Sequence, residues 1–381
     1  MNRVGGRHAH SHGDLPEASR RTRRIVAAVL IPAALVTLIA MLVMWPGRVD
    51  LPGGTSGGER VLGTVTAVAA TSATVQVDNG PVTTVDLPQG PGAVTLADGD
   101  EVVLLHFPGA VPGGPDYTVV DHQRGGGLTW LLALTVAVIL VFGRWRGLTS
   151  LAGLAISFAV LLFFIIPAIL EGSPPLLVAV VGASAIMFAA LYLTHGVTVH
   201  TSVAVAGTLA SLIVTGLLGA AFTAALHLTG VANDDDSFLS VTQGSIDMRG
   251  LLLAGIIIGA LGVLDDVTVT QATTVAEMAQ AGGTTCWGLY RAAIRIGRAH
   301  VASAVNTIVL AYAGTSLPLL LLIAAGPQPV GELLTSEFLS QEILRSAVGT
   351  IGLVASVPIT TALATLVAEI SVNGRHRLPQ P

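Results

Sequence analysis

Two adjacent carboxylates, Asp265 and Asp266, are the residues of this chain best placed to do chemistry. They follow an apolar run of about 14 residues, 251–264, which as a helix would extend roughly 21 Å and fall short of a hydrocarbon core of roughly 30 Å. The pair is therefore expected below the lipid surface, where a carboxylate costs at least about 2.5 kcal/mol and usually faces a bundle interior or a wet cavity. A carboxylate held there can exchange a proton or bind a cation.

The same pair also has a structural interpretation. Asp266 could cap a second helix that runs through Thr268 and Thr270 to Glu277, because Asp is a favoured N-cap residue. The two interpretations are compatible, since a helix N-terminus beside a break is a common way for a transporter to form an ion site. The candidate site for transport or coupling therefore includes Thr268 and Gln271 together with the two carboxylates.

Three further polar residues join this candidate site. His195 and His200 lie in the polar stretch 194–201 between two apolar runs, which either dips into the bilayer or forms a tight cytoplasmic turn. Asn306 lies inside another apolar run, where a lone amide serves as interhelical glue or as a ligand group.

The motifs of familiar enzymes do not occur in the sequence. It contains no Walker A motif, nucleophile elbow, HExxH or dinucleotide-binding glycine pattern. The single cysteine, Cys286, excludes an intrachain disulfide and a cysteine-based metal cluster. His8, His10 and His12 could capture a metal ion or simply belong to a disordered tail, and we assign no metal site. The sequence predicts no enzyme activity, no cofactor and no nucleic-acid partner, and it leaves a homo-oligomer open.

The amino-acid composition indicates which solvent surrounds the elements that hold these residues. The chain has 381 residues, of which 52% are hydrophobic and 11% charged, and its mean hydropathy is +0.76. In soluble domains roughly a quarter of all residues are charged, so the lipid bilayer must surround much of this chain. We expect an all-α polytopic transmembrane bundle of about eight helices, at residues 25–45, 128–142, 148–170, 176–193, 202–228, 251–264, 301–324 and 346–368.

The arginines predict the orientation of these spans. All 18 residues counted as lysine or arginine are arginine, and 13 of them fall on one side if eight spans alternate. Cytoplasmic loops carry the excess of positive charge, so this side is predicted to be cytoplasmic, together with both termini. The opposite side receives Glu171 and the acidic residues 234–236.

A different pattern occupies residues 46–127, between the first two predicted spans. Short β-branched stretches are found at 61–68, 73–78, 82–87, 101–107 and 117–121, and Asn79-Gly80 is a strong hairpin signal. These five strands predict a small extracytoplasmic β-barrel-like domain, OB-like in strand count. The predicted organisation is a disordered tail 1–24, an anchor 25–45, the β-domain 46–127, a seven-span bundle 128–370 and a tail 371–381.

A short internal echo is also visible. Arg146-Gly147-Leu148 and Arg249-Gly250-Leu251 each open an apolar run, and each is followed by a span that begins at a histidine, His200 or His300. Internal repeats are common in secondary transporters, although this match is brief.

Several of these features together resemble the YibE/F-like membrane proteins of Gram-positive bacteria. They are the glycine-rich run that ends in Leu264-Asp265-Asp266-Val267, the turn Thr194-His195-Gly196 followed by His200-Thr201, and the layout of anchor, exported domain and seven spans. The resemblance covers most of the chain after Gly127 and implies a multi-pass protein of the bacterial plasma membrane, without an assigned substrate. It also implies that Asp266 is the carboxylate typical of the family and that Asp265 is an addition.

Two functions follow as hypotheses. The first is a secondary transporter or permease-like protein that moves an unknown small solute or ion with the help of intramembrane carboxylates. The alternative is a non-transporting scaffold or sensor, whose outer β-domain binds a ligand or partner. The two hypotheses differ in whether Asp265 and Asp266 line a cavity or are covered by packed side chains.

Overall fold

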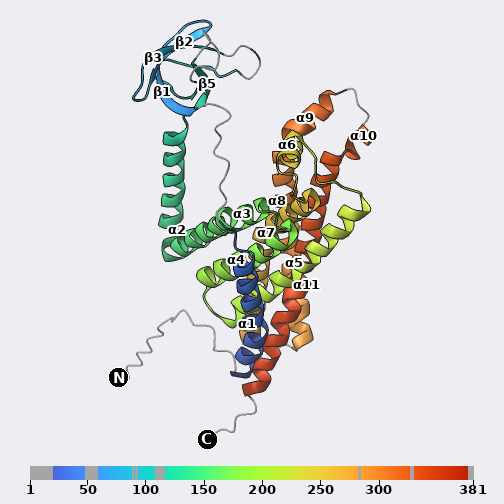
Figure 1. Cartoon of the computed structure of the whole chain (residues 1–381). Helices are drawn as coiled ribbons and strands as arrows, with labels where there is room; N and C mark the ends of the chain where they lie inside the picture. Colours follow the sequence, from blue (N-terminus) through green and yellow to red (C-terminus); the bar gives the residue numbers. More distant parts are fainter. Residues whose placement is uncertain are drawn as a thin grey trace, which may run out of the picture. The chain divides into compact units, whose positions relative to one another are not determined.

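The computed structural model describes residues 20–47, 59–87, 90, 93–107, 116–281, 285–326 and 330–375, so the three tail histidines His8, His10 and His12 lie outside it. The chain divides into two compact units, Met1–Gly47 with Thr149–Pro381, and Arg48–Leu148. Each unit has its own hydrophobic core. Figure 1 shows a small sheet in the second unit and long helices in the first.

The sheet consists of the five strands that the sequence predicts. Their bounds are β1 Glu59–Val68, β2 Ser72–Val77, β3 Val82–Asp86, β4 Glu101–His106 and β5 Tyr117–His122. All pairings are antiparallel, in the order β3-β2-β1-β4-β5. The hairpin turn predicted at Asn79 is confirmed, because this residue has a φ of 56° between β2 and β3.

The sheet is curled, as a small barrel-like domain requires. Register shifts interrupt the pairing of β1 with β2 and of β4 with β5, and such bulges increase the local twist. The outer strands β3 and β5 consequently approach each other. In the described part of this unit, the buried side chains of the inward face are aliphatic, namely Val65, Ala73, Val75, Val77, Val85, Val102, Leu104 and Val119.

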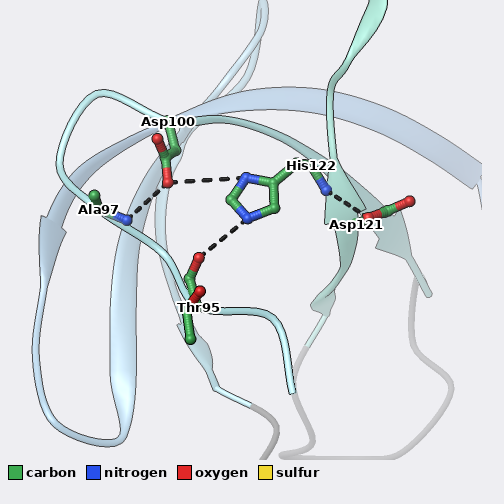
Figure 2. Close-up of polar contacts among 5 residues, drawn as sticks. All are labelled: Thr95, Ala97, Asp100, Asp121 and His122. Atoms are coloured by element: carbon green, nitrogen blue, oxygen red, sulfur yellow. Dashed lines mark hydrogen bonds and ion pairs between the residues drawn. The ribbon is translucent and has the colours of Figure 1, made fainter. Parts of the chain in front are cut away.

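Polar contacts tie the end of this sheet to a neighbouring loop (Figure 2). The His122 ring lies with Nε2 3.0 Å from the carbonyl oxygen of Thr95 and Nδ1 3.8 Å from Oδ2 of Asp100. The same Asp100 oxygen accepts a hydrogen bond of 2.8 Å from the backbone N–H of Ala97. The loop between β3 and β4 is thereby held against the last residue of β5.

A long helical stretch follows the sheet. Helix α2, Gly125–Val160, continues through the π-helix η2, Leu161–Ile165, into α3, Ile166–Leu170. Arg144 has non-helical angles, φ 49° and ψ −127°, which place a kink between the predicted spans 128–142 and 148–170. The chain therefore separates these two spans by a kink at one residue instead of a loop.

The other helices form the bundle. Their bounds are α1 Arg20–Val43, α4 Pro175–His195, α5 Val199–Ala225, α6 Asp234–Thr242, α7 Met248–Ala281, α8 Cys286–Thr315, α9 Leu317–Ala325, α10 Val330–Leu334 and α11 Glu337–Arg375. The predicted span 301–324 is thus divided between α8 and α9.

Six helical stretches in the described ranges are long and apolar enough to cross a membrane. They are Thr22–Val43, Gly125–Leu170, Pro175–His195, Val199–Ala225, Met248–Ala281 and Glu337–Glu369. The count is below the predicted eight because the kinked stretch counts once and because α8, which carries Arg291, Arg295 and Arg298, is not among the six. These apolar helices are those of a membrane-embedded protein.

The centre of the bundle is formed by α5, α7 and α11, which pack on one another. Ser211 and Thr215 of α5 are fully buried, whereas Ile213 and Leu217 of the same helix are more than 60% exposed. This arrangement is the reverse of that in a water-soluble helix. It is the arrangement expected when lipid covers the outer face.

A carboxylate joins the end of α5 to the start of α11. Oε1 of Glu337 accepts hydrogen bonds from the backbone N–H groups of Thr229, at 2.7 Å, and Gly230, at 3.2 Å. It also accepts a hydrogen bond of 2.8 Å from Nε2 of Gln341. The first turn of α11 is therefore fixed to the segment that follows α5.

Candidate functional site

The two carboxylates lie in the middle of a continuous helix. Helix α7 has 34 residues, Met248–Ala281, so both the predicted break after residue 264 and the cap at Asp266 are wrong. The reason is that the segment after the pair has its own buried stripe at helical spacing, made by Thr268, Ala272 and Val275. The depth of the pair therefore follows from its position halfway along a long helix, not from the shortness of the apolar run.

The two neighbours occupy different environments. Oδ1 of Asp265 is buried and has no hydrogen-bond partner among the described residues. The Asp266 side chain is 76% exposed, and its Oδ2 lies 3.9 Å from Nε2 of His300 on α8. This distance is too long for a hydrogen bond but brings Asp266 within range of an ion pair when His300 is protonated. Asp265 is thus the interior carboxylate, and Asp266 faces a titratable partner.

Thr268 and Gln271 connect this part of α7 to three other helices. Oγ1 of Thr268 lies 2.6 Å from Oγ1 of Thr208 on α5. Nε2 of Gln271 donates to the carbonyl oxygen of Ala293 on α8, at 3.0 Å, and to Oγ1 of Thr361 on α11, at 2.7 Å. Both residues are buried, so their polar groups hold the bundle together within two turns of Asp265.

The two predicted histidines flank a short turn. Helix α4 ends at His195 and α5 begins at Val199, and the Thr198 side chain accepts from the backbone N–H of Thr201 as an N-cap. His195 is exposed, and His200 is half-buried in the first turn of α5. No contact joins either histidine to the carboxylate pair in the ranges that the structure describes.

Asn306 is also separate from the pair. It lies on an exposed face of α8, and the neighbouring residue Thr307 lines a cavity instead. Of the seven predicted residues, the structure brings together Asp265, Asp266, Thr268 and Gln271 on α7.

The cavity lies between α7, α8 and α11 and has a volume of about 190 Å³. Its lining is mostly apolar, with hydroxyl groups from Thr307 and Tyr312. Gly259 and Val263 line it on α7, and Asp266 follows on the same helical face at the next turn. His300 similarly lies two turns before Thr307 on α8. The Asp266–His300 pair is therefore aligned with the faces that enclose the cavity.

The sequence analysis missed the buried hydroxyl groups of α5 and α11. Thr208, Ser211 and Thr215 of α5 and Ser356, Thr360 and Thr361 of α11 are all fully buried. Most of these hydroxyls donate to a carbonyl of their own helix, so they can be buried without a partner on another helix. The spacing of three or four residues from Thr208 to Ser211 to Thr215, and from Ser356 to Thr360, was the available signal, because residues at this spacing share a helical face.

Comparison with known proteins gives one match. A family model described as YibE/F-like protein matches residues 131–370, more than half of the chain. These residues include all of the candidate site and exclude the sheet. No match was found among curated proteins or among solved structures.

Proposed function

The chain belongs to the YibE/F-like family, and from this premise we propose that it is a secondary transporter or permease-like protein of the bacterial plasma membrane. Its cargo is a small solute or ion. The observation that carries the proposal is the buried Oδ1 of Asp265, which has no hydrogen-bond partner among the described residues and lies midway along a membrane-length helix.

An unsatisfied carboxylate oxygen at this position favours a transport role over a structural one. Carboxylates inside membrane segments are costly and usually mark ion pathways or proton relays. A carboxylate that served only to hold the bundle would be expected to accept hydrogen bonds, as Glu337 does at the end of α5. Asp265 is instead free to bind a proton or a small cation and to release it when the surroundings change.

The Asp266–His300 pair supplies a second exchangeable group beside the first. The pair lies across α7 and α8 and continues the faces that line the cavity. Movement between α7 and α8 would change the separation of the two side chains. We therefore assign Asp265 as the coupling group and Asp266 with His300 as a pair that responds to the opening of the cavity.

The proposed topology has eight crossings with both termini in the cytoplasm. The kink at Arg144 allows the stretch Gly125–Leu170 to supply two crossings, and α8 with α9 supplies another. Reporter fusions at Gly90 and Asp235 are expected to report the outside, and those at Gly283 and Pro379 the cytoplasm. A cytoplasmic signal at Gly90 would contradict the orientation.

The scaffold or sensor hypothesis remains the second candidate, and the independent core of the sheet supports it. The strands of Arg48–Leu148 bury their aliphatic residues against one another. Such a unit can bind a ligand or partner without any transport through the helices. This hypothesis predicts that substitution of the carboxylates has no effect on function.

The test is a comparison of Asp265→Asn, Asp266→Asn and the double variant in a deletion strain. The strain is first grown on a panel of metals, ions and antibiotics to identify its phenotype. We expect Asp265→Asn to abolish complementation while protein level and Tm stay nearly unchanged, because Asn keeps the shape and removes the charge. Asp235→Asn on the exposed α6 is the matched control and should complement fully. Normal complementation by the double variant would leave the scaffold hypothesis.

A further inference from the structure

Helices α5 and α11 carry the same residue pattern. Residues 207–215 read Gly-Thr-Leu-Ala-Ser-Leu-Ile-Val-Thr, and residues 352–360 read Gly-Leu-Val-Ala-Ser-Val-Pro-Ile-Thr. The two segments share Gly, Ala, Ser and Thr at identical positions. The Gly, Ser and Thr are four residues apart, so in each helix they lie on one face in the same order.

In the structure these two faces pack against each other in opposite directions. A Cβ atom added to Gly207 would overlap Oγ1 of Thr360, and a Cβ added to Gly352 would overlap Oγ1 of Thr215. The Thr of each segment therefore lies on the Gly of the other. Ser211 and Ser356 occupy the middle of both segments and are fully buried. The contact is reciprocal, as a two-fold axis through the crossing requires.

The reciprocity extends beyond the two segments. On one side of the crossing, Gly219 packs against Val348. On the other side, Val203 and Ala364 belong to one core cluster. A two-fold axis at Ser211 and Ser356 exchanges these two pairs, because it relates Gly219 to Ala364 and Val348 to Val203.

The neighbouring helices follow the same arrangement. Helix α4 packs on α5, α8 packs on α11, and α7 contacts both α5 and α11. Because α5 and α11 run in opposite directions, the pairs α4–α5 and α8–α11 have inverted topology on either side of α7. Inverted repeats of this kind place transport sites near the midplane, where the repeats meet.

The buried carboxylate lies at the level of this crossing. Thr208 of α5 contacts Thr268 of α7, and Gly219 packs against Leu253, so α5 and α7 are antiparallel. Because the two helices are antiparallel, a step forward along α5 matches a step backward along α7. Ser211 lies three residues after Thr208, and Asp265 lies three residues before Thr268, so Ser211 and Asp265 are at the same level. The candidate coupling group therefore occupies the same depth as the centre of the crossing.

The crossing is built so that the two helices can turn on each other. The hydroxyl of Ser211 donates to the carbonyl of Gly207, and that of Ser356 to the carbonyl of Leu353, so each stays within its own helix. Oγ1 of Thr360 has no hydrogen-bond partner among the described residues. Pro358 also removes one backbone donor from α11 at this point. Rotation at the crossing therefore breaks none of the hydrogen bonds made by Ser211 and Ser356, while the bonds of Glu337 to Thr229 and Gly230 lie beyond the end of α5.

We infer that α4–α5 and α8–α11 are inverted repeats, and that the crossing at Ser211 and Ser356 is the pivot about which they rock around α7. The inference rests on the proposed function for its meaning in transport, since rocking exposes Asp265 to each side in turn. The short echo at Arg146 and Arg249 does not mark these repeats, and His300 lies inside α8 instead of opening a span.

Distance measurements on the full chain in lipid nanodiscs test the pivot. In a Cys286→Ser background, spin labels at Leu226→Cys and Ile343→Cys report one end of α5 and α11, and labels at Val197→Cys and Leu366→Cys report the other end. All four positions are exposed, so labels should be tolerated. We expect two distance populations at each end, and we expect Asp265→Asn to shift the two ends in opposite directions.

The outcomes separate the pivot from the proposed function. A single population at each end, or a shift of both ends in the same direction, would overturn the pivot even if Asp265→Asn abolishes complementation. Two populations that Asp265→Asn leaves unchanged would keep the pivot and remove Asp265 as its coupling group.

Reciprocal variants test the two-fold relation itself. Gly207→Ala and Gly352→Ala each insert a methyl group against a threonine hydroxyl, so each should lower Tm by a similar amount and leave one distance population. Gly349→Ala is the matched control, because nothing lies within 4 Å of a Cβ at that position. If Gly207→Ala does not fold, Gly207→Ala/Thr360→Ala relieves the overlap and should restore folding. Unequal effects of the two glycine variants would contradict the symmetry.

Discussion

The sheet and the bundle both bury aliphatic side chains, but only the bundle also buries a set of hydroxyl groups among the residues that the structure describes. Among the described residues of the sheet, the buried side chains are those of Val, Leu and Ala, with Tyr117 packed partly buried against them. At the centre of the bundle, Ser211, Thr215, Ser356 and Thr360 are fully buried beside aliphatic residues, while other aliphatic residues such as Ile213 and Leu217 face outward. In water, burial of apolar surface drives folding, whereas in lipid the outside is as apolar as leucine and close packing with internal hydrogen bonds takes its place. The difference shows that the same chain is built for two solvents.

The largest expected loss of stability is in the sheet, and it would sharpen this comparison. Leu104 is fully buried, so Leu104→Ala should cost about 2–5 kcal/mol through lost burial and a cavity. Because small domains have a reserve of only about 5–15 kcal/mol, the strands should become sensitive to protease and hydrogen exchange. Val82→Ala, at a side chain that is 59% exposed, is the control and should change stability by less than about 0.5 kcal/mol. Equal protection in both variants would contradict a water-type core.

Exchanges between valine and threonine, which are nearly isosteric, should have an intermediate effect on stability, and the effect should differ between the sheet and the bundle. Val75→Thr places a hydroxyl in the aliphatic interior and should cost about 1–3 kcal/mol. Thr208→Val removes the contact with Thr268 and should cost about 0.6 kcal/mol, the average for hydrogen bonds between membrane helices. Chemical denaturation of the sheet and thermal unfolding of the bundle measure the two changes. A larger loss from Thr208→Val than from Val75→Thr would break the comparison.

The smallest effect concerns the surface of the sheet unit. Nη1 of Arg124 donates a hydrogen bond of 2.7 Å to Asp121, and this bond, with a second from the backbone N–H of His122, lowers the pKa of Asp121. A lowered pKa contributes stability at neutral pH, and the contribution is lost as pH falls through the lowered value. The pair is exposed, so Asp121→Asn should shift Tm less than either substitution above. Carboxyl titration by NMR checks the direction, and a raised pKa would contradict the contact.

The sequence was sufficient for elements with a strong local pattern. The five strands were found because β-branched residues alternate between turn signals, and the first apolar helix was found because its run is long enough to cross a bilayer. The grouping of Asp265 and Asp266 with Thr268 and Gln271 followed from their closeness along the chain, whereas the placement of all four on one continuous helix did not, because a break was predicted after residue 264.

The predictions from the sequence failed where the informative residues share one face of a helix instead of forming a continuous run. Hydropathy along 265–281 drops at the carboxylates and threonines, so the continuation of α7 was hidden although its buried stripe continues through Ala272 and Val275. The hydroxyl faces of α5 and α11 were missed for a different reason. Leucine and isoleucine lie between the serines and threonines and keep the mean hydropathy of each helix high, so the run of residues shows no polar signal. The partner of Asp266, His300, could not be found because it depends on how α7 and α8 pack.

The hydrogen bonds of Glu337 have a consequence for biosynthesis. Thr229 and Glu337 are 108 residues apart, so the ribosome completes α5 well before the residue that fixes its end. At a synthesis rate of about 5–20 residues per second, this interval lasts roughly 5 to 20 seconds. During this time the hydroxyl face of α5 has no α11 to cover it, and its hydroxyls rely on the bonds to their own helix. A chain that stops before Glu337 would leave this hydroxyl face of α5 without its α11 partner.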